Sequence, residues 1–184
     1  MSINRFPEPW LNFLREIDAK VNGKVVLHCL GGFAMVTLYG STRSTRDVDF
    51  IAVIPHEEAW QLTEIGGRGT ALYKKYGTYL DFVTVATVPE DYALRLRGMP
   101  SDELVNLNLY ALDPYDLALA KLERNSSRDR EDVEHLARTI PLDLDVLKDR
   151  YERELRPYLP VPEREDLTLR LWIEMIEEER DRTK

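Results

Sequence analysis

Three aspartates of this chain lie in apolar, β-branched surroundings, where a carboxylate needs a reason to be present. Asp47 and Asp49 are two residues apart at the start of an apolar run, so on a strand both side chains project from one face. Two neighbouring carboxylates repel each other, and their oxygens suit a hard divalent cation such as Mg²⁺ or Mn²⁺. Asp81 is the single acid within Tyr79–Val85, so either a metal or an arginine is its expected partner.

A glycine pair precedes these aspartates. The apolar run Val25–Leu30 ends at Gly31 and Gly32, where the missing Cβ atoms allow a sharp turn and the close approach of a ligand. Free amides at the start of the following helical pattern, Phe33–Tyr39, would form a phosphate site. Alone, a glycine pair indicates a turn and an Asp-x-Asp indicates surface chemistry. The order strand, Gly-Gly, helix, basic loop and Asp-x-Asp strand is far more specific and favours the functional interpretation.

Residues 25–54, VVLHCLGGFAMVTLYGSTRSTRDVDFIAVI, resemble the signature of the DNA polymerase β-like nucleotidyltransferase superfamily, where a Gly-Gly or Gly-Ser pair precedes an Asp-x-Asp strand. More narrowly, this stretch is similar to bacterial nucleotidyltransferase-like proteins related to the AbiEii toxins. The resemblance implies a mixed sheet, metal-binding Asp47 and Asp49, and a third catalytic and metal-binding carboxylate, Asp81. One position departs from the pattern: active transferases often have Ser or Thr after the glycines, and this chain has Phe33.

The resemblance also implies a reaction. A nucleoside monophosphate would move from a nucleoside triphosphate such as ATP to an acceptor, with Mg²⁺ or Mn²⁺ as cofactor. The acceptor stays open between a small molecule, a tRNA or other small RNA, and a protein, and one context is a toxin held in check by an antitoxin partner. Phe33 motivates an alternative, a catalytically weak nucleotide-binding or interaction protein of the same fold. The implied nucleotide-binding residues are Gly31, Gly32, Arg43, Arg46 and Lys121.

Lys121 belongs to a second resembling block, which runs from Leu112 to Val133. AbiEii-like proteins carry a similar "Asp-Leu…Lys-Leu…Arg-x-x-x-Asp" pattern after the core, where the lysine reaches the nucleotide phosphates. The match makes Asp129 or Asp132 the acidic partner of Lys121. The alternative is a lysine whose stem runs along the core while its charge stays in water.

Periodicity and turn residues predict the elements that must position these side chains. Asp113 followed by Pro114 predicts a helix start, and Asp143 predicts a second one. Arg95 and Arg97 alternate with leucines, which predicts a strand with an exposed face. We expect strands over residues 25–30, 48–54, 79–85 and 104–112, and helices over 7–21, 33–39, 56–64, 115–124, 143–156 and 163–182.

The predicted fold class is α+β, a nucleotidyltransferase fold with a mixed β-sheet flanked by helices. Residues 1–112 would form the nucleotidyltransferase core, and residues 113–184 a helical C-terminal region packed on or following it. The apolar side of the last helix would carry Leu167, Leu171, Ile173, Met175 and Ile176. This helix is either a lid on the core or a partner-binding helix.

Composition narrows the setting. The 184 residues carry a formal net charge of −8, a poor match for generic DNA binding. The residues from which a local basic patch could form lie near the proposed site in sequence: Arg43, Arg46, Arg68, Lys74 and Lys75. No stretch is long enough to span a membrane and the N-terminus lacks a signal-peptide pattern, so we expect a cytoplasmic protein without a membrane partner. Cys29, alone in an apolar strand, is expected to be a core residue. His28, within the same strand, is expected to be a satisfied core residue, and neither His56 nor His135 has a metal-ligand partner at useful spacing.

Overall fold

The computed structural model describes residues 5–100 and 102–182. These residues form two compact units, each described here by itself. The core unit comprises the residues up to Thr84 together with Leu96–Ala111. The helical unit comprises Val85–Arg95 and the residues from Leu112 onward. The chain therefore enters the helical unit twice: Val85–Arg95 is a short excursion, after which the chain returns to the core unit, and the second entry begins at Leu112.

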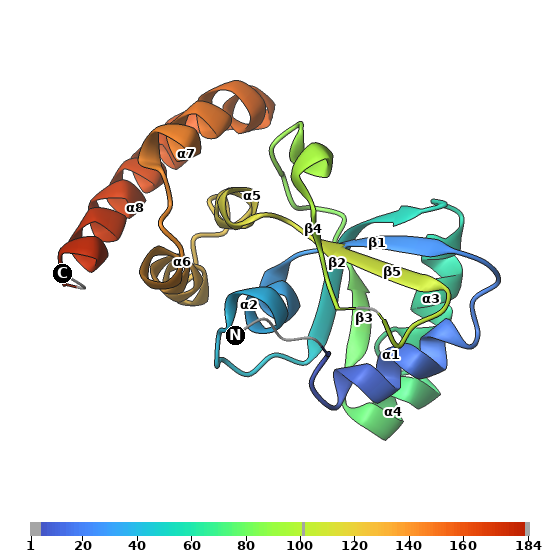
Figure 1. Ribbon diagram of the computed structural model, residues 1–184. Coiled ribbons are helices and arrows are strands. Elements are labelled where there is room, and N and C mark those ends of the chain that lie inside the picture. Colours follow the sequence, from blue (N-terminus) through green and yellow to red (C-terminus); the bar gives the residue numbers. More distant parts are fainter. Residues whose placement is uncertain (1–4, 101, 183–184) are drawn as a thin grey trace. The chain divides into compact units, whose positions relative to one another are not determined.

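A mixed sheet of five strands, in the order β3-β2-β1-β5-β4, organises the core unit (Figure 1). β1 lies antiparallel to β2 and parallel to β5, β2 lies parallel to β3, and β4 lies antiparallel to β5. The α+β class and the mixed sheet predicted from the sequence are confirmed. The strands are β1 (Val25–Cys29), β2 (Asp47–Ile54), β3 (Tyr79–Phe82), β4 (Arg97–Gly98) and β5 (Leu107–Ala111).

Four helices complete the core unit: α1 (Trp10–Asp18), α2 (Gly31–Tyr39), α3 (Glu58–Gly66) and α4 (Ala71–Tyr76). α1 was predicted and buries its apolar stripe, while α4 was not predicted. At the end of α1, the buried carboxylate of Asp18 accepts hydrogen bonds from the backbone N–H groups of Val105, Asn106 and Leu107. These bonds fix the chain where it enters β5.

A β-bulge in β2 sets which of its side chains are buried. His28 pairs with Ala52 but Cys29 pairs with Phe50, so Ile51 is an extra residue in β2. The bulge shifts the alternation of the strand, and the buried positions are Val48, Phe50 and Val53. Without the bulge, a strict period of two would place Val53 on the face opposite to Phe50.

Helices form nearly all of the regular structure in the helical unit. Asp113 caps α5 by accepting a hydrogen bond from the Asp116 N–H, and Asp143 caps α7, as the sequence predicted. Ser126 and Asp129 form a capping box at the start of α6. The elements are η1 (Tyr92–Arg95), α5 (Pro114–Leu119), α6 (Ser127–Thr139), α7 (Leu144–Arg150), η2 (Tyr151–Leu155), η3 (Arg156–Tyr158) and α8 (Pro162–Arg182).

Two predictions about this unit were wrong. Arg95 lies on the short helix η1 instead of an exposed strand, because its side chain is held by carboxylates of the same unit. The other arginine of that prediction, Arg97, does lie on an exposed strand, β4. In α8, Leu167 and Leu171 are 50% and 53% exposed. The buried stripe of α8 consists of Glu165, Thr168, Leu169, Trp172, Ile176 and Glu179.

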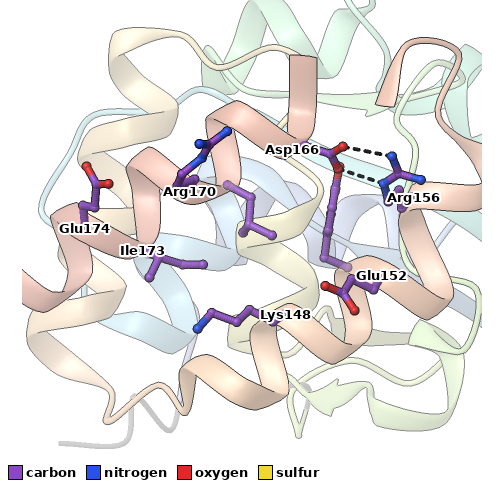
Figure 2. Close-up of a pocket in the computed structure, with 9 residues that line it drawn as sticks. Lys148, Glu152, Arg156, Asp166, Arg170, Ile173 and Glu174 are labelled. Carbon is purple, nitrogen blue, oxygen red and sulfur yellow. Dashed lines mark hydrogen bonds and ion pairs between the residues drawn. The ribbon is translucent and has the colours of Figure 1, made fainter. Parts of the chain in front are cut away.

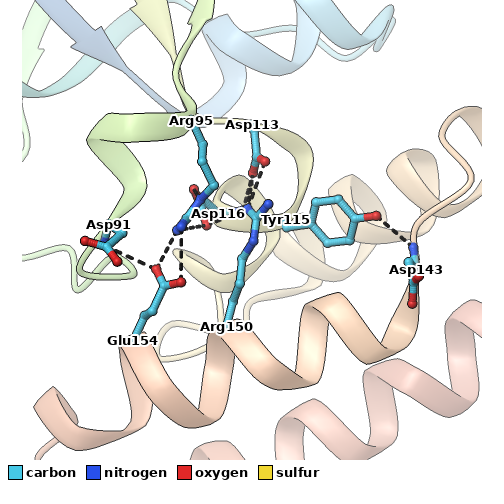
Figure 3. A network of polar contacts seen from close by, with 8 residues as sticks. All are labelled: Asp91, Arg95, Asp113, Tyr115, Asp116, Asp143, Arg150 and Glu154. Carbon is cyan, nitrogen blue, oxygen red and sulfur yellow. Dashed lines mark hydrogen bonds and ion pairs between the residues drawn. The ribbon is translucent and has the colours of Figure 1, made fainter.

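A network of ion pairs ties the Val85–Arg95 excursion to the helices (Figure 3). Arg95 Nε lies 3.0 Å from Asp116 Oδ2, and Arg95 Nη2 lies 2.6 Å from Glu154 Oε2. Arg150 Nη1 lies 2.8 Å from Asp113 Oδ2 and 3.0 Å from Asp116 Oδ1. Asp116 is fully buried, and this burial raises its pKa while the two arginines act in the opposite direction. Buried carboxylates here serve to hold the fold together.

Candidate functional site

Strand register brings the three predicted aspartates together. In the parallel pair β2–β3, Asp49 lies opposite Asp81, and Asp47 lies opposite Tyr79. Asp47 and Asp49 share a face of β2 because they are two residues apart. Each of the three aspartates offers one carboxylate oxygen, and these oxygens all lie within 4.8 Å of one another. Asp47 and Asp49 are half-buried, and Asp81 is exposed.

This carboxylate cluster, Asp47, Asp49 and Asp81, is chemically suited to a divalent cation. Its donors are all oxygen atoms, which Mg²⁺, Mn²⁺ and Ca²⁺ prefer. Three like charges within this distance repel one another, and a bound cation relieves the repulsion. Within residues 5–100 and 102–182, no other group of three His, Cys, Asp or Glu side chains meets the same distance condition.

Gly31 lies directly against the cluster. Its φ is +67°, a left-handed conformation that side chains disfavour, and a Cβ at this position would lie 1.9 Å from Asp49 Oδ2. The backbone N–H of Leu30 donates to the carbonyl oxygen of Asp49 at 3.1 Å. Glycine is therefore required here by backbone conformation and by the space that the carboxylate occupies.

Gly32 faces the basic loop between α2 and β2. A Cβ on Gly32 would lie 2.4 Å from Arg43 Nη2 and 2.8 Å from Thr45 Oγ1. Thr45 in turn donates its hydroxyl to Asp47 Oδ1 at 2.5 Å. The structure thus brings Arg43 to the start of α2, whereas the side chain of Arg46 is exposed. Thr45 was not predicted, although a hydroxyl two residues before an aspartate is a recognisable local pattern.

Phe33 faces the interior. Its ring is fully buried, stacks on Phe6 with centroids 5.5 Å apart, and meets the edge of Trp10 at 5.0 Å. The side chain at this position therefore belongs to the core. The first turn of α2 begins at Gly31. Its N-cap residue is Leu30, whose side chain forms no capping hydrogen bond. In the first turn of a helix the backbone N–H groups have no partner within the helix, so they are the donors that an anion would meet.

Lys121 is a buried member of an ionic group in the helical unit. Its Nζ lies 2.7 Å from Asp132 Oδ2 and 3.6 Å from Asp129 Oδ1. Of the two predicted acidic partners, Asp132 is the direct one. Asp129 also accepts from Arg124 and Ser126, and these hydrogen bonds outweigh the effect of burial and lower its pKa.

Two further titratable groups lie on β1. Burial lowers the pKa of His28, which favours the neutral imidazole. Burial, together with the charge of Asp49, raises the pKa of Cys29, so this fully buried thiol stays protonated at neutral pH. Cys29 is a core residue, as predicted.

A pocket of about 780 Å³ lies in the helical unit between η2 and α8 (Figure 2). Asp166 accepts hydrogen bonds there from Arg156, at 2.8 and 2.9 Å, and from Tyr151. Leu169 and Ile173 add apolar surface. None of the predicted site residues lines this pocket, and its charges already include a two-pronged ion pair.

The sequence matches one family model over residues 11–180, which is most of the chain. That family is described as a nucleotidyltransferase of unknown function (DUF6036). Comparisons with curated proteins and with solved structures gave no match. The chain belongs to this nucleotidyltransferase family.

Among the described residues, no helix combines the length and the apolar character that crossing a membrane requires.

Proposed function

We propose that this family member is a metal-dependent nucleotidyltransferase that moves a nucleoside monophosphate from a nucleoside triphosphate to a hydroxyl of an acceptor. The observation that carries the proposal is the carboxylate cluster, with its oxygens within 4.8 Å and Gly31 pressed against Asp49. A glycine turn, an open helix start and three convergent carboxylates combine phosphate binding with cation binding. The family match supports the same class of chemistry.

The reaction is a displacement at the α-phosphorus. The acceptor oxygen forms a bond to phosphorus, the bond to the bridging oxygen of the β-phosphate breaks, pyrophosphate leaves, and solvent takes the acceptor's proton. The amides of Gly31, Gly32 and Phe33 bind the phosphates, and Arg43 balances their charge. Mg²⁺ or Mn²⁺ held by the cluster would supply charge neutralisation at the reacting phosphate. Lys121 has no role in this proposal, because its buried Nζ is paired with Asp132 inside the helical unit.

The acceptor, the biological role and the extent of catalysis complete the proposal. The acceptor is a small molecule, a small RNA such as a tRNA, or a protein. The resemblance to AbiEii-related proteins supports a toxin that an antitoxin restrains, and toxicity on expression that D49N relieves would test this role. The alternative is a nucleotide-binding protein with little catalysis, which the lack of a hydroxyl side chain at Phe33 favours.

Calorimetric titration of the four ribonucleoside triphosphates, with and without Mg²⁺, tests the proposal. We expect Mg²⁺-dependent binding of at least one triphosphate by the wild type and a loss of more than about tenfold in D49N. Asp102→Asn is the matched control, because Asp102 is an exposed aspartate of the core unit outside the cluster. Absence of binding, or equal binding by D49N and wild type, would contradict the proposal. Binding that ignores Mg²⁺ would favour the alternative.

A further inference from the structure

Arg68 is held at the edge of the carboxylate cluster by an aromatic side chain. It lies between α3 and α4, is exposed, and has glycine on both sides. Its Nη2 donates to the hydroxyl of Tyr79 at 2.6 Å, and its guanidinium carbon lies 4.8 Å from the centre of the Tyr79 ring. An exposed arginine with two contacts to one ring has a defined position, which most surface arginines lack.

Tyr79 connects this arginine to the cluster. It is 7% exposed, and the ring of Tyr73 packs edge-on against it at 5.5 Å. Tyr79 lies opposite Asp47 in the β2–β3 pair and two residues before Asp81, so the three share one face. The hydrogen bond to Tyr79 raises the pKa of Arg68, and the carboxylate of Asp81 acts in the same direction.

The strand order places Arg68 and Gly31 on opposite sides of the cluster. Gly31 follows β1 and touches Asp49 from that side, whereas Arg68 contacts β3, the edge strand beyond β2. In phosphoryl transfer the attacking and leaving oxygens lie roughly in line on opposite sides of phosphorus. If the triphosphate lies at the Gly31 side, the acceptor approaches from the side of Arg68.

We propose that Arg68 binds a phosphate group of the acceptor, so that the acceptor is a nucleotide or the end of a short RNA. This inference rests on the proposed function. A guanidinium is planar and presents five N–H donors in a fork that matches phosphate oxygens, and the bond to Tyr79 uses one of them. Tyr79 holds the guanidinium without neutralising it. Recognition of one phosphate beside the reacting hydroxyl is compatible with a chain of net charge −8, which disfavours long nucleic acids.

The test measures acceptor binding with the triphosphate site filled. The protein is saturated with Mg²⁺ and the α,β-methylene analogue of the triphosphate that it binds, and is then titrated with adenosine 5′-monophosphate, a trinucleotide RNA, or adenosine. We expect the phosphate-bearing probes to bind the wild type and R68A to weaken them about ten- to a hundredfold, with adenosine unaffected. R68K should recover part of the affinity, because it keeps the charge and loses the fork. Preference for the monophosphate or for the trinucleotide distinguishes a free nucleotide from an RNA end.

K74A is the matched control, because it removes one exposed positive charge from neighbouring α4. Its affinities should stay within about threefold of the wild type if Arg68 acts by contact instead of by general attraction. Equal weakening by K74A, unchanged binding by R68A, or no binding of either phosphate probe would overturn the inference. Loss of the methylene analogue itself in R68A would place Arg68 on the triphosphate side and overturn it too. Failure of the wild type to bind any triphosphate is a failure of the proposed function and is seen before a probe is added.

Discussion

The two units use aspartate in opposite ways. Four aspartates of the helical unit are at most 3% exposed, and each has an oxygen within 3.0 Å of an arginine or lysine nitrogen. These four are Asp113, Asp116, Asp129 and Asp132. In the core unit, the carboxylate cluster is half-buried to exposed, and its members converge on one another.

This difference in burial and in partners separates carboxylates that stabilise the fold from carboxylates that are candidates for cation binding and catalysis. Burying a carboxylate is costly unless donors surround it, and the helical unit supplies those donors from its own arginines and from Lys121. The core unit follows the same rule at Asp18, which accepts three backbone hydrogen bonds. In the carboxylate cluster, by contrast, the acids of β2 and β3 lie close to one another, and such a group fits a site that a cation completes.

The largest expected effect is the loss of stability in Asp116→Asn. The substitution leaves Arg95 and Arg150 facing a neutral amide in a buried setting, so we expect the free energy of unfolding to fall by about 3 kcal/mol. Urea denaturation measures the change. Asp81→Asn is the counterpart in the core unit, and its unfolding free energy should stay within about 0.5 kcal/mol of the wild type, because Asp81 is exposed.

If both variants lost similar stability, the carboxylate cluster would be a structural feature like the network around Asp116. If Asp116→Asn were as stable as the wild type, the ion pairs of the helical unit would contribute little to the free energy of unfolding. The contrast between the two units would then not extend to stability.

Gly31→Ala and Gly40→Ala test, within the core unit, whether the glycine beside the carboxylate cluster has a role in binding. The φ of +67° at Gly31 should cost an alanine about 1–2 kcal/mol of unfolding free energy. Gly40 has a φ of +68° with nothing within 4 Å of a built Cβ, so Gly40→Ala should lose a similar amount. Only Gly31→Ala must displace the Asp49 carboxylate, and we expect it alone to weaken Mg²⁺-dependent nucleotide binding, by about ten- to a hundredfold.

Calorimetry on both variants separates backbone strain from the displaced carboxylate. Equal nucleotide affinity in Gly31→Ala and Gly40→Ala would show that the contact between Gly31 and Asp49 has no role in binding. A large loss in Gly40→Ala would show instead that the end of α2 matters as much as its start.

Much of the core unit could be predicted because its signals are local. Alternation places Asp47 and Asp49 on one face, and apolar runs that end at glycine or proline predict strands. The pairing of Asp49 with Asp81 depends on the parallel register of β2 and β3, which local patterns do not contain. It came from the family resemblance, and the structure gives its geometry.

The errors lie where tertiary partners override local pattern. Arg95 alternates with leucines and so indicated a strand, but Asp116 and Glu154 hold it on η1. In α8, Leu169 and Trp172 lie inward with the acids Glu165 and Glu179, because arginines offset those charges, and Leu167 and Leu171 stay exposed. Counting apolar residues alone therefore selected Leu167 and Leu171 wrongly, while Ile176 is buried as predicted.

The smallest expected effect is the loss of stability that the buried Asp129 causes when the pH is lowered. Hydrogen bonds from Arg124 and Ser126 hold its folded-state pKa below the ordinary 3.8, so its contribution to stability is complete above that value and is lost as the pH falls through the folded pKa. Asp129→Asn removes this titration while leaving the other groups in place. The difference in unfolding free energy between wild type and Asp129→Asn should shrink by about 1 kcal/mol between pH 5 and pH 3. A constant difference over this range would show that the shape of the Asp129 side chain, and not its charge, stabilises the capping box, so the contrast between the two units would rest on burial alone.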